Sequence, residues 1–263
     1  MDYPPLVGGV LLRRYKRFLA DVRLDDGREV VAHCPNTGSM RAVNMPGCRV
    51  WLSPSDNPRR KLAWTWELIE LPQPDGSLAM ASVQTGRANR IVEEALRGGW
   101  VSALSGYADL RREAPVATEG EKASRIDFRL DDPERGTAFV EVKQVTLRES
   151  DGHGYFPDAV SERGRKHLEA LMALAEVGQR AVLLFCVAHE GIDDVAPAEH
   201  LDPAYAATLR EAAGRGVEVL ARRCRVRRRD GVPVAICLDA ELPVALQRRL
   251  TVGAVNGRYR SAG

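Results

Sequence analysis

Two carboxylates and one amine in neighbouring strand-like segments are the residues of this sequence that most clearly could do chemistry. Asp127 stands in SRIDF, and Glu141 and Lys143 stand in FVEVKQ. Successive side chains of a strand point to opposite faces, so we expect Glu141 and Lys143 to point the same way. A hairpin would bring Asp127 beside Glu141, where the two carboxylates repel each other unless a positive charge separates them. We therefore expect a divalent cation, Mg²⁺ or Mn²⁺, with Asp127 and Glu141 as ligands.

Such a group points to cleavage of a phosphodiester bond, because a metal and a positioned water together can carry out that reaction. Lys143 would orient or activate the water and offset the negative charge of a phosphate. A D-(x)n-E-x-K pattern on a hairpin flanked by helices resembles the PD-(D/E)xK nuclease core, in which a further acid often comes from an upstream helix. Glu94 is the preferred candidate over Glu93, and Glu113 is the rival. The alternative is a structural, salt-bridged hairpin without chemistry.

The surrounding segments predict the α/β elements that must position this hairpin. NRIVEEALRGGW predicts a helix before it, and SERGRKHLEALMALAEVG predicts an amphipathic helix after it, with Ser161 as its N-cap. The apolar run RAVLLFCVA predicts a strand covered on both faces. This strand, helix, strand order implies a right-handed crossover. A further helix follows with Asp202 at its N-cap, and then a strand in VEVLARRCRV.

The first eighty or so residues instead predict short β-strands separated by turns rich in Gly, Pro and Asn, as in a small barrel or sandwich. The segment LPQPDGS at 71–77 is a plausible boundary. The predicted domains are 1–82, an OB-like barrel that binds nucleic acid; 83–228, a nuclease-like α/β domain; and 229–263, a partly irregular extension whose last residues look frayed.

Bulk composition restricts the class of protein. The chain has 263 residues and a net charge of +2, which is too small to establish a nucleic-acid partner. Five scattered cysteines without a CxxC pair argue for reduced thiols in the cytoplasm. The order of charges around the first apolar run is wrong for a secretory signal, and no segment is apolar enough to span a bilayer. We expect no membrane and no organic cofactor; the oligomeric state stays open, a homodimer being one alternative.

Several clusters could hold DNA by charge, hydrogen bonds and stacking. The segment RRYKRF interleaves cations with aromatic rings, as OB-folds do to bind single strands. HCPNTGSM forms a turn dense in donors, and SERGRKHL could grip a phosphate at a helix N-terminus. The predicted nucleic-acid contacts are Arg13, Arg14, Tyr15, Lys16, Arg17, Asn36, Thr37, Ser39, Arg60, Lys61, Arg125, Arg163, Lys166 and His167. The run RRCRVRRR at 222–229 would add a non-specific, salt-sensitive contribution. For each cluster the alternative is a solvated surface or a structural turn.

Long ordered motifs, among them HCPNTGSM, RKLAWTWEL, FVEVKQVTL and FPDAVSERGRKHLEAL, resemble those of the sugar fermentation stimulation protein A (SfsA) family over about residues 8–220. The chain departs from the expected family pattern near residue 83, where it reads VQT, and after residue 225. The resemblance implies an OB-like β-barrel followed by a PD-(D/E)xK nuclease-like α/β domain, and DNA binding with little sequence specificity.

Three functions follow from these observations. The first is a DNA-binding protein with a working magnesium-dependent nuclease site. The second is a non-catalytic DNA-binding regulator of sugar or maltose metabolism on a nuclease-derived scaffold. The third, suggested by the family name alone, is a carbohydrate-binding protein, although no aromatic-rich sugar groove is evident.

Overall fold

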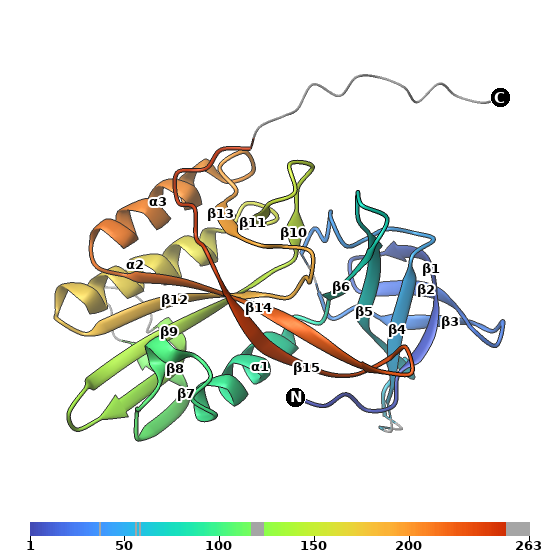
Figure 1. Ribbon diagram of the computed structural model, residues 1–263, viewed down its shortest axis with the longest axis horizontal. Helices are drawn as coiled ribbons and strands as arrows, with labels where there is room; N and C mark the ends of the chain where they lie inside the picture. The colour runs from blue at the N-terminus through green and yellow to red at the C-terminus, as the bar shows by residue number, and fades with distance from the viewer. Residues whose placement is uncertain (37, 56, 58, 117–123, 251–263) are drawn as a thin grey trace.

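The computed structural model describes residues 1–36, 38–55, 57, 59–116 and 124–250 of the chain (Figure 1). An all-β part comes first in the chain and an α/β part follows it, so the predicted fold class is confirmed. None of the described helices combines the length and the apolar character that crossing a bilayer requires.

The all-β part is a closed barrel. Its strands are β1 Val7–Tyr15, β2 Leu19–Leu24, β3 Glu29–His33, β4 Arg49–Pro54 and β5 Trp64–Pro72. Antiparallel pairing runs in the order β3-β2-β1-β4-β5, and a parallel pairing of Ala32 with Trp64 joins β3 to β5 and closes the ring. β6 Leu78–Ser82 pairs with β5, so the segment 71–77 contains the turn of a β-hairpin. Closure leaves the barrel strands without a free edge.

The α/β part is built on one mixed sheet. Its main elements are α1 Gly86–Arg97, β7 Asp109–Val116, β8 Ser124–Asp132, β9 Gly136–Val145, α2 Glu162–Glu176, β12 Arg180–Val187, α3 Pro203–Gly214, β14 Glu218–Arg229 and β15 Val232–Leu242. The sheet order is β15-β14-β12-β9-β8-β7. Short elements complete the part: a 3-10 turn at Ser102–Leu104, and β10 Leu147–Arg148, β11 Gly154–Phe156 and β13 Val195–Pro197 in a small separate sheet.

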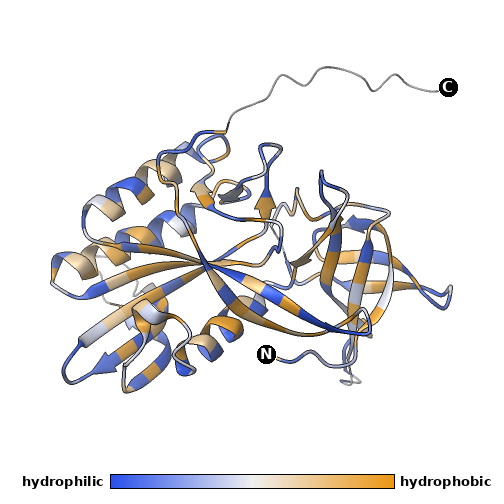
Figure 2. Cartoon of the chain, viewed as in Figure 1, coloured by the Kyte–Doolittle hydropathy of each residue, from blue (hydrophilic) through white to orange (hydrophobic). Residues whose placement is uncertain are grey.

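Helices cover both faces of the main sheet. Ile91 and Val92 of α1 pack against Val140 and Val142 of β9, while Leu168 of α2 belongs to the apolar cluster of the opposite face. Figure 1 shows α2 and α3 together on one side, and Figure 2 shows hydrophilic and hydrophobic residues mixed along both, as amphipathic helices require. The central strand β9 therefore lies between two apolar layers, and a charged side chain on it must find a partner.

Both predicted helix caps are present. The Ser161 hydroxyl accepts a hydrogen bond from the Gly164 N–H at 3.1 Å and begins α2. The Asp202 carboxylate accepts from the Tyr205 N–H at 2.9 Å and begins α3, and it also accepts from the Ser161 N–H at 2.8 Å. One buried aspartate thus ties the starts of the two helices together, which determines how α2 lies over the sheet.

The C-terminal segment that we expected to be partly irregular contributes one long strand, β15, paired with β14. Residues at the amino end run along β15: the Tyr3 N–H donates to the Val234 carbonyl, and the Ile236 N–H donates to the Met1 carbonyl, both at 2.9 Å. The chain start therefore crosses from the barrel to the edge of the second sheet (Figure 1). Residues 251–263, expected to fray, lie outside the described part.

A buried ion pair joins the barrel to α1. Arg87 donates from Nη2 to Glu67 Oε1 at 2.6 Å and from Nε to Oε2 at 2.9 Å. Ser53 also donates to Glu67, at 2.7 Å, and the Arg87 guanidinium lies 5.3 Å from the centre of the Tyr3 ring. Glu67 is 1% exposed and Arg87 is 9% exposed. Two parallel hydrogen bonds of this kind fix the orientation of α1 relative to the barrel as well as the distance between them.

His189, which follows β12 and forms a bridge with Ala81 of β6, makes the stability of the folded protein depend on pH. It is buried, it pairs with Ala81, and its Nδ1 accepts from the Gly191 N–H at 3.0 Å. Burial lowers the pKa of His189 from 6.5 to about 4, and the positive charge of Arg148 acts in the same direction. As the pH falls, the unfolded chain takes up this proton at a higher pH than the folded protein does. The histidine's contribution to the free energy of unfolding is therefore full above pH 6.5, and it falls by about 3 kcal/mol as the pH approaches 4.

We expect a His189→Gln variant, whose amide oxygen can replace Nδ1, to lose less stability over this range than the unmodified protein. Urea denaturation at several pH values between 4 and 7 measures the difference. Identical pH slopes for the two proteins would contradict the assignment.

Candidate active site

The site forms where β8 and β9 stop pairing. Their ladder runs from Asp132–Gly136 to Phe128–Val140 and ends there. The next free N–H of β9, that of Val142, donates to Asp127 Oδ2 at 2.8 Å. The Asp127 carboxylate thus takes the place of a backbone carbonyl of β8. It accepts from the Val142 N–H, which would otherwise be unpaired where the two strands separate. The hairpin predicted from the sequence therefore brings Asp127 to the residue between Glu141 and Lys143.

Glu141 is the most enclosed charged group of the site, at 1% exposed. Its Oε1 accepts from Lys143 Nζ at 2.6 Å and forms a short contact with Nδ1 of His167 on α2. Glu141 and Lys143 thus point to the same face, the one covered by α2. The second oxygen, Oε2, is buried and has no hydrogen-bond partner among the described residues. An unpartnered carboxylate oxygen at this depth is costly and calls for a cation or a water.

The two carboxylates have different proton affinities. Burial raises the pKa of Asp127 above its ordinary value and the nearby Glu141 charge raises it further, against the opposing effect of the Val142 N–H and Asn89. Burial also acts to raise the pKa of Glu141, but the hydrogen bond from His167 and the charge of Lys143 outweigh it and hold that pKa below its ordinary value. Glu141 therefore stays ionised, and Asp127 is short of compensating positive charge.

These residues fit a hard divalent cation. Carboxylate oxygens are the ligands that Mg²⁺ prefers, and Glu141 Oε2 has no partner within the part of the chain that the structure describes. Within the described residues, no group of three His, Cys, Asp or Glu side chains is arranged to hold a metal. The protein would thus supply two carboxylates, Asp127 and Glu141, and the remaining positions would go to water and backbone, which Mg²⁺ accepts readily.

The upstream helix contributes an amide to this site. Asn89 of α1 donates from Nδ2 to Asp127 Oδ1 at 2.7 Å. Glu94, the preferred acid from the sequence, pairs with the amino group of Met1, and Glu93 pairs with Arg97 at 3.0 Å. Glu113, the rival, has a positive φ of 51° and is exposed on β7, opposite Asp127 but outside the ladder. Of the residues on α1, Asn89 is the one that the structure brings to Asp127.

His167, predicted as a phosphate contact, is buried against Glu141. Arg163 Nε donates to its Nε2 at 3.3 Å, which favours the tautomer with the proton on Nδ1, where it can donate to Glu141. This arrangement uses Glu141 Oε1 and leaves Oε2 without a hydrogen-bond partner among the described residues. The imidazole is therefore a positioning group for the carboxylate, of the kind that supports metal ligands in many sites.

We expect His167→Ala to weaken Mn²⁺ binding by about 10- to 100-fold, because Glu141 loses the donor that orients it. His167→Gln, which keeps an N–H donor, should recover part of the affinity. Calorimetric titration with Mn²⁺ measures both. His200→Ala is the matched control, since His200 makes a similar pair with Glu149 at 2.9 Å outside the site. Equal Mn²⁺ affinity in His167→Ala and the unmodified protein would refute the positioning role.

The predicted DNA contacts of the barrel divide into engaged and outward-facing side chains. Arg13 pairs with Asp21 at 2.7 Å and lies over the Tyr15 ring. Arg14 donates to the carbonyls of Asn36 and Gly38, at 2.9 and 3.0 Å, so it supports a turn. Lys16 and Arg17 form the exposed turn between β1 and β2, both at positive φ. Ser39 donates to Asp158 of the second domain at 3.0 Å. Thr37 lies outside the described residues.

The other predicted contacts lie apart from this turn. Arg60 donates to Thr65 at 3.1 Å, whereas Lys61, Arg125 and Lys166 are exposed. The basic run 222–229 is largely neutralised by acids from distant segments. Its ion pairs are Arg222–Glu241, Arg223–Asp193, Arg225–Asp239, Arg227–Asp2 and Arg228–Glu190. A run of paired arginines attracts DNA less than the bare sequence suggests.

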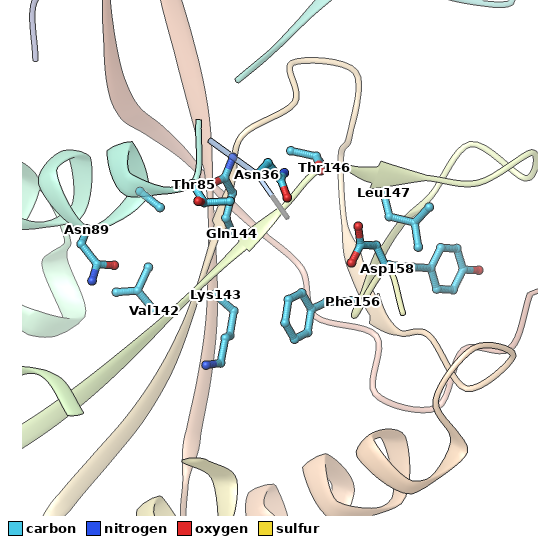
Figure 3. Close-up of a pocket in the computed structure, with 12 residues that line it drawn as sticks. Asn36, Thr85, Asn89, Val142, Lys143, Gln144, Thr146, Leu147, Phe156 and Asp158 are labelled. Carbon is cyan, nitrogen blue, oxygen red and sulfur yellow. The ribbon is translucent and has the colours of Figure 1, made fainter. Parts of the chain in front are cut away.

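A cavity of about 270 Å³ opens beside Lys143, between the barrel and the α/β domain. Figure 3 shows Asn89 and Lys143 on one side of it, Asn36 and Gln144 above them, and Phe156 with its ring toward Lys143. Both domains thus contribute side chains next to the candidate catalytic amine. Lys143 joins this cavity to Glu141, and Asn89 and Val142 join it to Asp127.

Sequence reasoning missed Asn89, Gln144, Phe156 and Asp158. For Asn89 a signal existed: it stands three residues before Val92 and so shares a face with the buried residues of α1, where a polar side chain needs a reason. For Phe156 and Asp158 no such signal existed, because their contacts are with segments far away in the chain.

Comparisons with known proteins agree with this architecture. The model of the SfsA N-terminal OB domain matches residues 12–80, and that of the sugar fermentation stimulation protein RE domain matches residues 86–230. A sugar fermentation stimulation protein homolog from Chromohalobacter salexigens is 64% identical over 95% of this chain and 97% of its own length. A homolog from Shewanella halifaxensis is 50% identical over 90% and 96%, respectively.

A solved structure gives the same result. SfsA of Pyrococcus furiosus, in complex with Ca²⁺, matches with a TM-score of 0.78 and 27% identity, over 93% of this chain and 98% of that chain. The family resemblance and the OB barrel predicted from the sequence are thereby confirmed. The chain belongs to the sugar fermentation stimulation protein (SfsA) family.

Proposed function

We propose that the protein is a metal-dependent phosphodiesterase that cuts DNA with little sequence preference. The observation that carries the proposal is the placement of Asp127 at the Val142 N–H, between Glu141 and Lys143 in the chain, while Lys143 donates to Glu141 Oε1. The other oxygen of Glu141, Oε2, is buried and has no hydrogen-bond partner among the described residues. A salt bridge between Lys143 and Glu141 uses Glu141 Oε1 and does not account for the buried Oε2, which has no partner among the described residues. The Ca²⁺ complex of the Pyrococcus furiosus relative supports a divalent cation in this family.

Each residue of the site has a defined part in this proposal. Asp127 and Glu141 would hold Mg²⁺ or Mn²⁺, which when bound polarises a phosphate and lowers the pKa of water. His167 and Asn89 orient the two carboxylates. Lys143 lies between Glu141 and the cavity. Its ammonium would contact a phosphate oxygen or an attacking water that enters the cavity. The exposed cations Lys16, Arg17, Lys61, Arg125 and Lys166 would attract the DNA backbone.

We place this activity in the cytoplasm, because all five cysteines are free thiols, as a reducing compartment keeps them.

A second candidate function is a DNA-binding regulator without cleavage. One observation favours it: the helix position nearest Asp127 holds the amide of Asn89, which has no charge to give to a cation. Two carboxylates would then bind metal more weakly than three.

The test is cleavage of supercoiled plasmid, linear duplex and single-stranded DNA by the purified protein in Mg²⁺, Mn²⁺, Ca²⁺ or EDTA. We expect nicking or degradation in Mg²⁺ or Mn²⁺, none in EDTA, and DNA binding that weakens steeply as salt increases. Salt-sensitive binding without cleavage in any metal would leave the second function. Absence of both binding and cleavage would refute both.

A further inference from the structure

We propose that the seam between the barrel and the α/β domain receives an unpaired strand, with one base stacked on Phe156 beside Lys143. The inference rests on the proposed function and adds the class of substrate: single-stranded DNA or an unpaired end, in preference to an intact duplex.

The cavity beside Lys143 has the lining that a nucleobase needs. Amide and hydroxyl groups from both domains surround it, namely Asn36, Thr85, Asn89, Gln144 and Thr146. Its volume of about 270 Å³ lies just below the range of pockets for drug-sized ligands, about 300–1,000 Å³, so it suits a single ring system. Base edges are read by such amide and hydroxyl groups, and bases still within a duplex have these edges paired.

Phe156 provides the stacking surface. Its ring lies 5.6 Å from the ring of Phe185 and 5.3 Å from the ring of Tyr205, measured between ring centres. Phe185 and Tyr205 are fully buried and pack against Phe156, which lines the cavity (Figure 3). An aromatic ring fixed in this way can stack on any base, because every base has a π-face.

A second pocket continues the path away from Lys143. Its volume is about 430 Å³, and it shares Phe156 and Asp158 with the first. Its lining also includes Arg17, in the exposed turn between β1 and β2, and the next residue, Phe18, is 48% exposed. The loop between the first two strands of an OB-fold commonly binds oligonucleotides, and cation–aromatic pairs suit single strands.

Contacts between the domains preform this path. Asp158 accepts from the Ser39 hydroxyl and from the Met40 N–H, both at 3.0 Å, which fixes the barrel turn to the loop that carries Phe156. Thr85 donates to the Pro35 carbonyl at 2.8 Å from the other side. A strand lying along both pockets would place a backbone phosphate near the Lys143 ammonium while its base occupies the cavity.

The test is fluorescence anisotropy of the full chain, in EDTA to prevent cleavage, with a labelled single strand, the same sequence as a blunt duplex, and a duplex with an unpaired end. We expect the single strand and the unpaired end to bind more tightly than the blunt duplex. Phe156→Leu should weaken single-strand binding by about tenfold and leave duplex binding unchanged, whereas Phe156→Tyr should keep it. Trp100→Leu, a change of an exposed aromatic residue that lines neither of the two pockets, is the control and should bind normally.

Arg17→Gln is a second variant on a surface turn, which keeps the proposal testable if Phe156→Leu does not fold; it should weaken single-strand binding severalfold. Equal or tighter binding of the blunt duplex by the unmodified protein, or single-strand affinity unchanged by both Phe156→Leu and Arg17→Gln, would overturn the inference. In that case DNA binding and cleavage themselves would persist and the proposed function would stand. If the unmodified protein neither binds nor cleaves nucleic acid, both this inference and the proposed function are wrong.

Discussion

We expect Lys143→Met to lower the rate of the proposed metal-dependent DNA cleavage by about two to three orders of magnitude, and Asp127→Asn to do so at least as strongly. Methionine preserves the length of the side chain but removes the ammonium, which lies 2.6 Å from Glu141 and borders the cavity. The developing charge on a phosphate then loses its nearest protein cation. Asparagine at 127 keeps the shape but weakens the cation position by removing one of two carboxylate charges.

The two variants should differ in a second measurement. Asp127→Asn weakens Mn²⁺ binding in calorimetry, whereas Lys143→Met should bind Mn²⁺ at least as well as the unmodified protein, because a competing cation next to Glu141 is gone. Arg28→Met, a change of an exposed arginine that pairs with Asp26, is the control and should cut normally. If Lys143→Met and Asp127→Asn both cut at the rate of the unmodified protein, this site does not perform the reaction.

Arg87→Met destabilises the folded protein by about 3–5 kcal/mol, because it leaves the Glu67 carboxylate buried without its main partner. Glu67 is 1% exposed, and once Arg87 is gone Ser53 is the one hydrogen-bond donor to it among the described side chains. The same pair joins the barrel to α1, which carries Asn89 to the candidate site. Loss of this contact should therefore lower Mn²⁺ affinity as well as stability.

Urea denaturation measures the effect, and the chain provides its own comparison. Arg97 and Glu93 form an exposed i,i+4 pair at 3.0 Å, and Arg97→Met should cost less than about 0.5 kcal/mol. The double variant Glu67→Gln, Arg87→Met should recover much of the lost stability, because no unpaired charge remains. A cost for Arg87→Met as small as that for Arg97→Met would show that the buried pair does not hold the domains together.

Local sequence patterns were sufficient to predict the order of the main helices and strands and part of the candidate site. Ser161 and Asp202 cap the helices that their positions predicted, and Glu141 and Lys143 share a face because alternation is a property of the strand itself. Asp127 could be placed beside them because a hairpin connects its strand to theirs through a short turn. These relations need only neighbouring residues, so one sequence suffices to find them.

Contacts between distant segments could not be read in this way. Helical periodicity indicates that His167 lies on one face of α2, but not that this face covers Glu141. The arginines of 222–229 look like a free basic patch until Asp193, Asp239 and Glu190 come beside them from other parts of the fold. An acid was expected on the upstream helix, and the packing of α1 presents Asn89 to Asp127.

By itself, the sequence determined the all-β part followed by an α/β part, the helices with their caps at Ser161 and Asp202, and the shared face of Glu141 and Lys143, because hydrophobic period and capping act over a few residues. Only the tertiary structure decided which oxygen of Glu141 stays unpartnered, which charges are neutralised, and that the barrel turn and Phe156 enclose a cavity next to Lys143. Those features depend on the closed barrel and on its packing against the second domain. Burial and charge pairing arise only where segments that are distant in the chain come into contact, so no single segment determines them.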